Sequence, residues 1–486
     1  MNLDQDACYA IISARDVRYD GRFFTAVRTT GIYCRPICPA RLPNRKNVIF
    51  YASAAVAQEA GFRPCLRCRP ETAPDTPAWR GTSSSVGRAL RLIEEGALDS
   101  GSVEHLAARL GLGERQLRRL FLKHVGASPG SVALTRRLLL AKQLLHETEL
   151  NITQVAMASG FGSIRRFNEA FQQVFKVAPS FLRREIGSEG HGVPTAEIKL
   201  KLRYRAPYDW AAIADFMRAR LYPGLETFES GVYRRSLCVD GGIGIVVVSQ
   251  GKGNWLDVQV KLKELSLLPK VIARVREAFD LAADPDVIGA HLALDQDLQD
   301  LVVRRPGLRV PGAFDPFEVG IRAILGQQIT VTAAIKLGAT LVSHLGEALP
   351  DDWATEAGVS RLFPTAHAIL ASSLDFLGMP QSRVRCLKAF CAAYLAKSDF
   401  FGGETLAVLS RLRAVPGIGP WTASYIALRA LRDPDAFPAE DVALARGLMP
   451  PGAERPSRDV LEQRSQVWRP WRAYAAQHIW TELASG

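Results

Sequence analysis

The sequence predicts a multidomain protein that is mainly α-helical with α+β parts. Its 486 residues exceed one ordinary domain, since the usual length is roughly 150 residues per domain. Two polar stretches rich in Pro, Gly and Ser, residues 70–85 and 187–196, interrupt the chain and are typical of linkers. The spacing of apolar residues also changes, from three- and four-residue intervals before the second linker to alternation after it. We therefore expect four modules.

The four modules differ in their residue patterns. Residues 1–75 carry four clustered cysteines, and residues 86–186 place apolar side chains at the spacing of short helices. Residues 197–281 contain alternating stretches such as "AEIKLKLRYR" and "NWLDVQVKLKEL", which predict the strands of an α+β module. Helical patterns dominate residues 282–486, which we expect to be all-α.

The composition, with 48% hydrophobic and 23% charged residues, is that of an ordinary globular protein. No apolar run approaches the ~20 residues of a membrane span. The N-terminus lacks the basic start and apolar core of a secretion signal. We therefore expect a soluble, cytoplasmic protein without a membrane partner.

Positive charge is concentrated in the first part of the chain. The net charge is +12, and residues 1–187 hold 27 Lys and Arg against 16 Asp and Glu, whereas the remaining residues hold 34 against 33. A local excess of this size favours a polyanionic partner, most simply nucleic acid.

Four cysteines have the spacing of metal ligands. Cys34 and Cys38 form C-x3-C, and after a gap of 26 residues Cys65 and Cys68 form C-x2-C. Two close pairs brought together by a loop can surround one tetrahedral Zn²⁺, and in a reducing cytosol clustered cysteines are more often metal ligands than disulfides. Spacing alone favours a purely structural zinc ion, one per chain. The other cysteines lack this spacing and are expected to be small buried hydrophobic residues: Cys8, Cys238, Cys386 and Cys391.

The same segment resembles a known family. "AVRTTGIYCRPIC" and "NVIFYASAAVAQEAGFRPCLRC" are similar to the N-terminal domain of the Ada DNA-repair proteins, over residues 1–75. The resemblance implies that Cys34 is both a zinc ligand and a nucleophile that takes a methyl group irreversibly from a DNA methylphosphotriester. Because this reaction would remove one negative charge from the zinc centre, we expect it to strengthen DNA binding. The resemblance also implies four phosphate contacts: Thr30, Arg41, Arg63 and Arg67.

Two stretches, "SVEHLAARLGLGERQLRRLFLKH" and "NITQVAMASGFGSIRRFNEAFQQVF", share one design. In each, a predicted helix (103–110 or 153–159) meets a turn at Gly111 or Gly160, and a second helix exposes Arg and Gln. This is the helix-turn-helix arrangement, whose second helix enters the major groove, and the doubled pattern resembles AraC-type regulators. An ordinary helical bundle is the alternative. The candidates for contact with promoter DNA are Arg115, Gln116, Arg118, Ile164, Arg165 and Asn168.

A glycine hairpin marks the C-terminal module. "LRAVPGIGPWTASYIALRAL" (412–431) predicts a helix, a tight turn and a second helix. Gly417 and Gly419 in this turn allow the backbone to approach a DNA phosphate closely. No strand precedes the turn and no third glycine follows, which excludes a dinucleotide-binding loop. Further on, "DAFPAEDVALARGL" places Asp441 before an apolar helix.

Residues 197–486 resemble the helix-hairpin-helix DNA glycosylases of the AlkA type, through this hairpin and through "FEVGIRAILGQQITVTAAIKL" and "WRPWRAYAAQHIW". The resemblance implies that Asp441 is the catalytic carboxylate. Breaking an N-glycosidic bond leaves an oxocarbenium-like sugar, which a nearby carboxylate stabilises. Glu440 is not expected to share this role, because successive helical positions point about 100° apart. Without the hairpin, Asp441 would be interpreted as a helix N-cap.

Aromatic residues are expected around a base flipped out of the duplex. N-alkylated purines such as 3-methyladenine are cationic, and a cation gains roughly 0.5–2 kcal/mol on an indole face. Trp468 and Trp480 are expected in the core instead. The residues expected in the base pocket are Trp421, Tyr425 and Trp471.

Two further features concern the DNA strand. Trp421 occupies the position where strand-cleaving relatives carry a Schiff-base lysine, so we expect base excision without strand cleavage. Gln327 or Gln328 is expected to fill the space left by the flipped base, although relatives carry a leucine at the position of Gln328.

Together, these features predict an alkylation-damage repair enzyme that also regulates transcription. Its partners would be damaged DNA, promoter DNA and, during activation, RNA polymerase, and we expect a monomer. One alternative is a methylation-responsive activator whose glycosylase-like half is inactive. Another is a glycosylase whose N-terminal modules only tether it to DNA.

Overall fold

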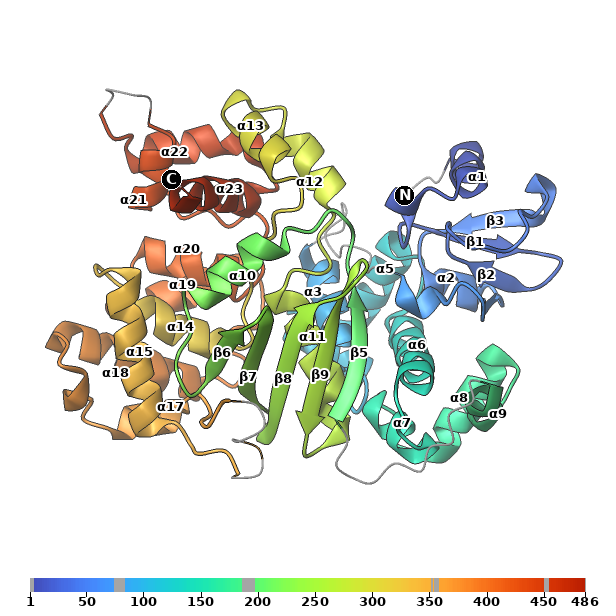
Figure 1. Cartoon of the computed structure of the whole chain (residues 1–486), viewed down its shortest axis with the longest axis horizontal. Helices are drawn as coiled ribbons and strands as arrows, with labels where there is room; N and C mark the ends of the chain where they lie inside the picture. The colour runs from blue at the N-terminus through green and yellow to red at the C-terminus, as the bar shows by residue number, and fades with distance from the viewer. Residues whose placement is uncertain are drawn as a thin grey trace. The chain divides into compact units, whose positions relative to one another are not determined.

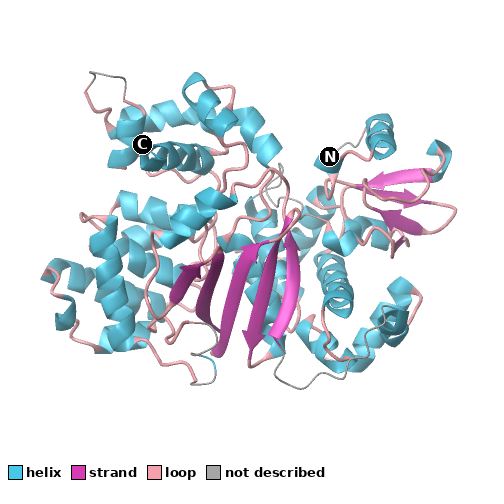
Figure 2. Cartoon of the chain, viewed as in Figure 1, coloured by secondary structure: helices cyan, strands magenta, loops and turns pink. Residues whose placement is uncertain are grey.

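The computed structural model describes residues 4–73, 84–185, 197–350, 353, 358–449 and 454–485. The predicted linker 187–196 and most of the predicted linker 70–85 lie outside these residues. The chain divides into two compact units, of which the first contains residues 1–205 and 251–273, and the second contains residues 206–250 and 274–486. Helices predominate in both units (Figures 1 and 2), so the predicted fold class, mainly α with α+β parts, is confirmed.

The N-terminal segment of the first unit is a small α/β module. Its four strands have the order β3-β1-β2-β4, in which β1 is antiparallel to β2 and β3, and β2 is parallel to β4. Val48 and Phe50 alternate toward one side of the sheet, where they pack with Cys8 and Ile12 of the first helix. The elements are α1 (Gln5–Ala14), β1 (Phe24–Val27), β2 (Ile32–Cys34), β3 (Val48–Tyr51), α2 (Ala54–Glu59) and β4 (Arg63–Pro64).

Short helices fill residues 84–185. Capping explains where two of them begin: Ser102 caps the helix that follows it, and Asn151 forms a reciprocal capping box with Gln154. The predicted helices 103–110 and 153–159 correspond to α4 and α7. The helices are α3 (Ser84–Glu94), α4 (Val103–Arg109), α5 (Glu114–His124), α6 (Pro129–Glu147), α7 (Ile152–Ala158), α8 (Ile164–Phe175) and α9 (Pro179–Glu185).

The strands after residue 197 are antiparallel in each unit. In the first unit β5 (Glu197–Arg203) pairs with β9 (Trp255–Leu262), and alternate residues of both strands are buried, as their sequence pattern predicts. In the second unit β7 (Val232–Val239) pairs with both β6 (Glu226–Glu229) and β8 (Gly242–Gln250).

A helical core organises the second unit. Phe317 stacks on Phe390 at 5.6 Å between ring centroids, and Gly320 permits this packing because an added Cβ would lie 2.2 Å from the Phe390 ring. Ile418 and Ala423 belong to the same core, which anchors the glycine hairpin. The helices are α10 (Trp210–Arg218), α12 (Pro285–Leu292), α13 (Gln296–Arg304), α14 (Pro316–Leu325), α15 (Val331–Leu345), α17 (Ala366–Ala371), α18 (Gln381–Ala396), α19 (Thr405–Arg413), α20 (Pro420–Arg429), α21 (Val442–Gly447), α22 (Arg458–Arg464) and α23 (Arg472–Ser485), and α11 (Leu268–Ala278) extends into this unit from the first.

Two further expectations concern the four cysteines outside the cluster and the membrane-spanning helices. Cys8, Cys386 and Cys391 are buried as predicted, but Cys238 is exposed, because its position on β7 faces outward between two buried neighbours. None of the described helices combines the length and the apolar character that crossing a membrane requires.

Candidate metal centre and catalytic pocket

Strands β2 and β4 bring the four predicted metal ligands together. Their parallel pairing lets the amide of Cys65 donate to the carbonyl oxygen of Tyr33 (2.9 Å). Cys34 ends β2, and the Sγ atoms of Cys34, Cys38, Cys65 and Cys68 all lie within 4.8 Å of one another. Four sulfurs at ~2.3 Å from a tetrahedral Zn²⁺ would lie roughly 3.8 Å apart. The cluster therefore has the size that one zinc ion requires.

The surroundings of the cluster also fit a metal centre. Arg35 forms a buried ion pair with Asp20 and donates to the carbonyl oxygen of Cys68 (3.2 Å), which fixes the loop between the ligands. Contact with the other thiols, chiefly a hydrogen bond with Cys38, raises the pKa of Cys34. A divalent cation reverses this effect because it stabilises the thiolate form of every ligand. The donor set therefore fits Zn²⁺.

We expect removal of zinc with a chelator to unfold the N-terminal module. Its hydrophobic clusters are small, and structural zinc supplies roughly 10–16 kcal/mol in comparable peptides. Hydrogen exchange of the amides in β2 and β4 measures the loss, while α14 and α20 of the second unit should keep their protection. Unchanged exchange of β2 after verified zinc loss would contradict the assignment.

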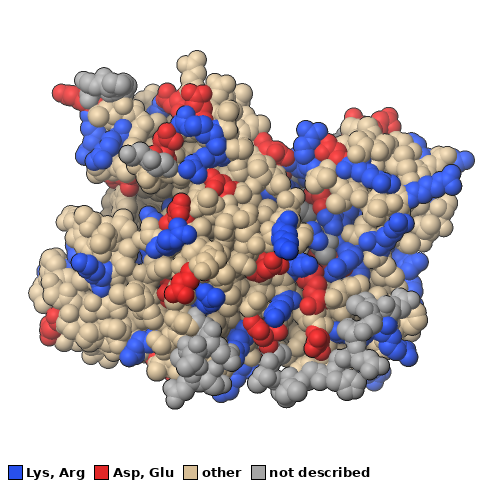
Figure 3. Space-filling model, in the orientation of Figure 1, with Lys and Arg blue, Asp and Glu red and all other residues tan. Residues whose placement is uncertain are grey.

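The predicted DNA contacts of this module lie at its surface. Thr30, Arg41 and Arg67 are exposed, and Arg63 is half-buried on β4. Within the described part of the chain, none of these arginines forms an ion pair with an acidic side chain. Lys and Arg side chains gather over this module on the face that Figure 3 shows. The surface is thus suited to an anionic ligand.

The two helix-turn-helix patterns have the predicted geometry. Gly111 and Gly160 connect the helices with φ of +70° and +93°, a conformation that favours glycine. Helices α5 and α8 follow these turns, and the predicted contact residues lie near their N-terminal ends. All six are exposed: Arg115, Gln116, Arg118, Ile164, Arg165 and Asn168.

Asp441 caps helix α21 and also receives two indole N–H groups. Its Oδ1 accepts from the amide of Leu444 (2.9 Å) and from Nε1 of Trp480 (3.1 Å). Its Oδ2 accepts from Nε1 of Trp421 (2.7 Å). The N-cap position and the predicted role as catalytic carboxylate are therefore compatible, because the cap holds the carboxylate in a fixed orientation beside the two tryptophans.

Helix α20 presents three side chains at intervals of four residues. Trp421 stacks on Tyr425 with 5.3 Å between ring centroids and 13° between ring planes. The guanidinium of Arg429 lies over Tyr425 (5.5 Å) and over Trp480 (5.4 Å), and burial lowers the pKa of Arg429 to about 10. Arg429 thus covers one ring face of Tyr425 and one of Trp480. Trp421, in contrast, stacks on Tyr425 alone among the described aromatic residues.

The other tryptophans and Glu440 lie in different surroundings. Trp468 is fully buried, and Trp471 is 7% exposed with its ring edge-on to Tyr474. Trp480 is half-buried, and its Nε1 donates to Asp441 (3.1 Å), so it lies beside the carboxylate rather than in the core. Glu440 forms an ion pair with Arg458 (3.0 Å).

We expect Trp480→Phe to slow base release by about 10–100-fold. The substitution keeps an aromatic ring but removes the Nε1 donor to the Asp441 carboxylate, and hydrogen bonds to charged groups are worth ~1.5–3 kcal/mol. Single-turnover release of base from methylated DNA measures the effect. Trp255→Phe is the matched control, since its Nε1 donates to Asp257 (3.0 Å) in the first unit. Equal rates for Trp480→Phe and Trp255→Phe would contradict the predicted catalytic role of Asp441.

The hairpin between α19 and α20 requires glycine at one position. Gly417 has a φ of +92°, and an added Cβ would lie 2.8 Å from the Cβ of buried Cys386. Gly419 is the N-cap of α20, and an added Cβ there would meet no atom within 4 Å. The close approach of α18 therefore explains Gly417, and Gly419 leaves the N-terminus of α20 open to a ligand.

Gln327 and Gln328 have different surroundings. Gln327 donates from Nε2 to the carbonyl oxygen of Gly417 (2.9 Å) and to Oγ1 of Thr422 (3.1 Å). The backbone carbonyl oxygen of Gln327 accepts a hydrogen bond from Arg383 (2.6 Å). Gln328 is exposed and has a φ of +56°. Gln327 thus ties its loop to the hairpin, and Gln328 is the side chain that the loop presents to solvent.

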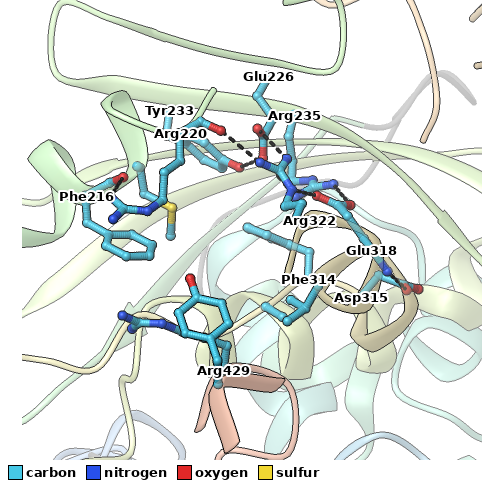
Figure 4. A pocket seen from close by; sticks show the side chains of 15 residues that line it. Phe216, Arg220, Glu226, Tyr233, Arg235, Phe314, Asp315, Glu318, Arg322 and Arg429 are labelled. Atoms are coloured by element: carbon cyan, nitrogen blue, oxygen red, sulfur yellow. Dashed lines mark hydrogen bonds and ion pairs between the residues drawn. The ribbon is translucent and has the colours of Figure 1, made fainter. Parts of the chain in front are cut away.

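A cavity of about 80 Å³ lies beside Tyr425. Its polar wall is a network of ion pairs in which Arg235 and Arg322 bind Glu226 and Glu318 (Figure 4). Arg429 lies apart from this network in Figure 4 and forms no ion pair with a described acidic residue. Sequence reasoning missed Arg429, Arg220 and Phe216 as lining residues, because no short motif contains them.

Comparison with known families gives three matches. The metal binding domain of Ada matches residues 7–71, a helix-turn-helix domain matches residues 106–185, and the AlkA N-terminal domain matches residues 199–315. These matches confirm the predicted resemblances.

Individual relatives extend these matches. The chain is 38% identical to the probable bifunctional transcriptional activator/DNA repair enzyme AlkA of Mycobacterium tuberculosis, over 99% of this chain and 97% of that protein. It is 32% identical to DNA-3-methyladenine glycosylase 2 of Escherichia coli, over 57% of this chain and 95% of that protein. The solved structure of the 3-methyladenine DNA glycosylase from Archaeoglobus fulgidus matches with a TM-score of 0.51 at 21% identity, over 57% of this chain and 96% of that one, and supports the fold alone.

Proposed function

The chain belongs to the family of bifunctional transcriptional activator/DNA repair enzymes that includes AlkA of Mycobacterium tuberculosis, and from this membership we propose that it repairs alkylated DNA at two separate sites. One site transfers a methyl group from a DNA methylphosphotriester to Cys34. The other hydrolyses the N-glycosidic bond of an alkylated base of the 3-methyladenine type with the help of Asp441. One observation carries the proposal: a single chain holds a four-sulfur cluster and a carboxylate bound by two indoles.

The first reaction is a nucleophilic substitution at carbon. Sγ of Cys34 attacks the methyl carbon, the new S–C bond forms, and the C–O bond of the triester breaks with its electron pair on oxygen, which restores the phosphodiester. Zinc bound by the four cysteines would keep this sulfur a thiolate at neutral pH. The exposed Thr30, Arg41 and Arg67, with Arg63 beside the cluster, are suited to hold the neighbouring phosphates.

The second reaction breaks the bond between the sugar C1′ and the base nitrogen. The base leaves with the bonding electrons, and water completes the hydrolysis at C1′. The Asp441 carboxylate stabilises the cationic sugar and orients the water, while Trp421 and Trp480 hold the carboxylate in place. A cationic base would stack on the face of Trp421 that Tyr425 does not cover.

Two residues determine what happens to the DNA strand. Trp421 offers no amine, so no Schiff base forms and the product is an abasic site in an intact strand. Gln328, exposed at the tip of its loop, would fill the space that the flipped nucleotide leaves. Gln327 would hold that loop against the hairpin.

The helix-turn-helix pair gives the repair protein its regulatory role. The exposed residues of α5 and α8 would read promoter DNA in two major grooves. Methylation of Cys34 removes one negative charge near these helices and strengthens binding to the DNA polyanion. As a promoter-bound monomer in the cytoplasm, the chain would then recruit RNA polymerase.

A single preparation of the full chain tests both activities. It is incubated with duplex DNA treated with a methylating agent, and free base and the mass of the peptide containing Cys34 are both measured. We expect released 3-methyladenine, no strand cleavage, and one added methyl group on that peptide. Methyl transfer without base release would favour the alternative of an activator whose glycosylase-like half is inactive. Base release without methyl transfer would favour a glycosylase whose N-terminal modules only tether it to DNA.

A further inference from the structure

Helix α6 of the first unit contains a fully buried lysine that neither reaction uses. The Nζ of Lys142 donates to Oε2 of Glu71 (2.8 Å) and to the carbonyl oxygen of the zinc ligand Cys65 (3.2 Å). Both side chains of this ion pair are buried, with exposed fractions of 0% and 1%. The same Nζ lies 5.8 Å from the ring centroid of Phe175, at the end of α8. Lys142 thus lies between the cysteine loop and the second helix-turn-helix.

The rest of the contact between α6 and this loop is also polar. Oγ1 of Thr135 donates to Oε1 of Gln58 (2.8 Å), and the amide of Ser128, which caps α6, donates to Oε1 of Glu59 (3.1 Å). Helix α6 also contacts α2, and α8 contacts strand β4, which leads directly into Cys65. The segment from residue 58 to residue 71 therefore rests on both α6 and α8.

A buried ion pair is a poor means of gaining stability. Removing two charges from water costs free energy that their attraction often fails to recover, and apolar residues of similar volume stabilise such a site equally well. In some proteins such a pair instead fixes one arrangement of two packed segments. Here Lys142 holds the loop of the zinc ligand Cys65 against α6 and beside Phe175 of α8, the helix that carries the exposed Ile164, Arg165 and Asn168.

We propose that the polar face of α6 is the docking surface for residues 58–71 of this chain, and that Lys142 is the positioning residue that couples methylation at Cys34 to promoter binding through α8. The inference rests on the proposed function and adds the route between its sensor and its promoter-binding helices. It requires Lys142 for the gain in promoter affinity on methylation, but for neither methyl transfer nor base excision.

The test uses the full chain with Lys142→Met, which keeps an unbranched apolar stem and removes the ammonium group. The probe is a set of duplexes selected from a random pool by the methylated wild-type protein. We expect the ratio of affinities between methylated and unmethylated protein to fall by about tenfold, whereas methyl uptake and base release stay within about twofold of wild type. Lys397→Met is the matched control, since it breaks an exposed ion pair with Asp399 (3.3 Å) in the second unit.

Two further variants keep the test decisive. Lys142→Arg retains the positive charge and should recover most of the affinity ratio, which a role in stability alone would not predict. If Lys142→Met fails to fold, Thr135→Val removes the bond to Gln58 without changing side-chain shape, and we expect the ratio to fall by about threefold. If the folded Lys142→Met protein keeps the wild-type ratio of affinities between methylated and unmethylated protein, the inference is wrong. The same holds for Thr135→Val where it replaces a Lys142→Met protein that does not fold. Loss of methyl uptake or base release by the wild-type chain would instead contradict the proposed function.

Discussion

Asp441→Asn should lower the rate of base release from methylated DNA by on the order of 10²–10³-fold, the loss typical when one preorganised electrostatic group is removed from a catalytic site. Asparagine keeps an oxygen that can cap Leu444, and Asn and Asp are similar N-caps, so the fold should persist. It removes the negative charge that stabilises the cationic sugar. With its oxygen capping Leu444, its NH₂ group would take the place of Oδ2 and face the indole N–H of Trp421. Single-turnover release of 3-methyladenine measures the effect.

The neighbouring carboxylate provides the matched control for this substitution. Glu440 forms its ion pair with Arg458, whose side chain is exposed, so Glu440→Gln should leave base release within about twofold of wild type. Thermal unfolding of both variants separates catalysis from stability. A nearly active Asp441→Asn protein, or an equal loss in both variants, would refute the assignment of Asp441.

Cys34→Ser should abolish methyl transfer altogether. A serine hydroxyl is not ionised at neutral pH, and it offers zinc a weak ligand, so no nucleophile remains at this position. Mass spectrometry after incubation with methylated duplex DNA should show one added methyl group per wild-type chain and none on the variant. Base release, which we propose for Asp441 of the second unit, should continue at the wild-type rate. Induction of a reporter promoter should be lost together with methyl transfer.

Cys238→Ser is the matched control, because Cys238 is an exposed thiol outside the cluster. We expect full methyl uptake by this variant. A methyl group on Cys38, Cys65 or Cys68 in the Cys34→Ser protein would show that the cluster lacks a unique acceptor. Continued promoter induction by Cys34→Ser would show that the zinc centre has only a structural role.

The sequence by itself predicted the metal cluster and the two helix-turn-helix units, which depend on local spacing. The intervals between cysteines indicated one metal centre, and the four sulfur atoms meet as expected. Helical periodicity broken by Gly111 and Gly160 predicted two helix-turn-helix units, because helix and turn propensities act within a few residues. The module boundaries and the roles of the individual site residues stay predictions.

Tertiary structure alone decided which side chains complete these sites. Trp480 reaches Asp441 across 39 residues of chain, and Lys142 reaches Glu71 across 71. Neither sequence separation follows a helical or strand period, so no pattern could place Trp480 beside Asp441 rather than in the core. Nor could a pattern distinguish Gln327, which bonds to the hairpin, from the exposed Gln328. The physical reason is that sequence spacing encodes interactions within an element, whereas contacts between elements depend on how whole helices and strands pack.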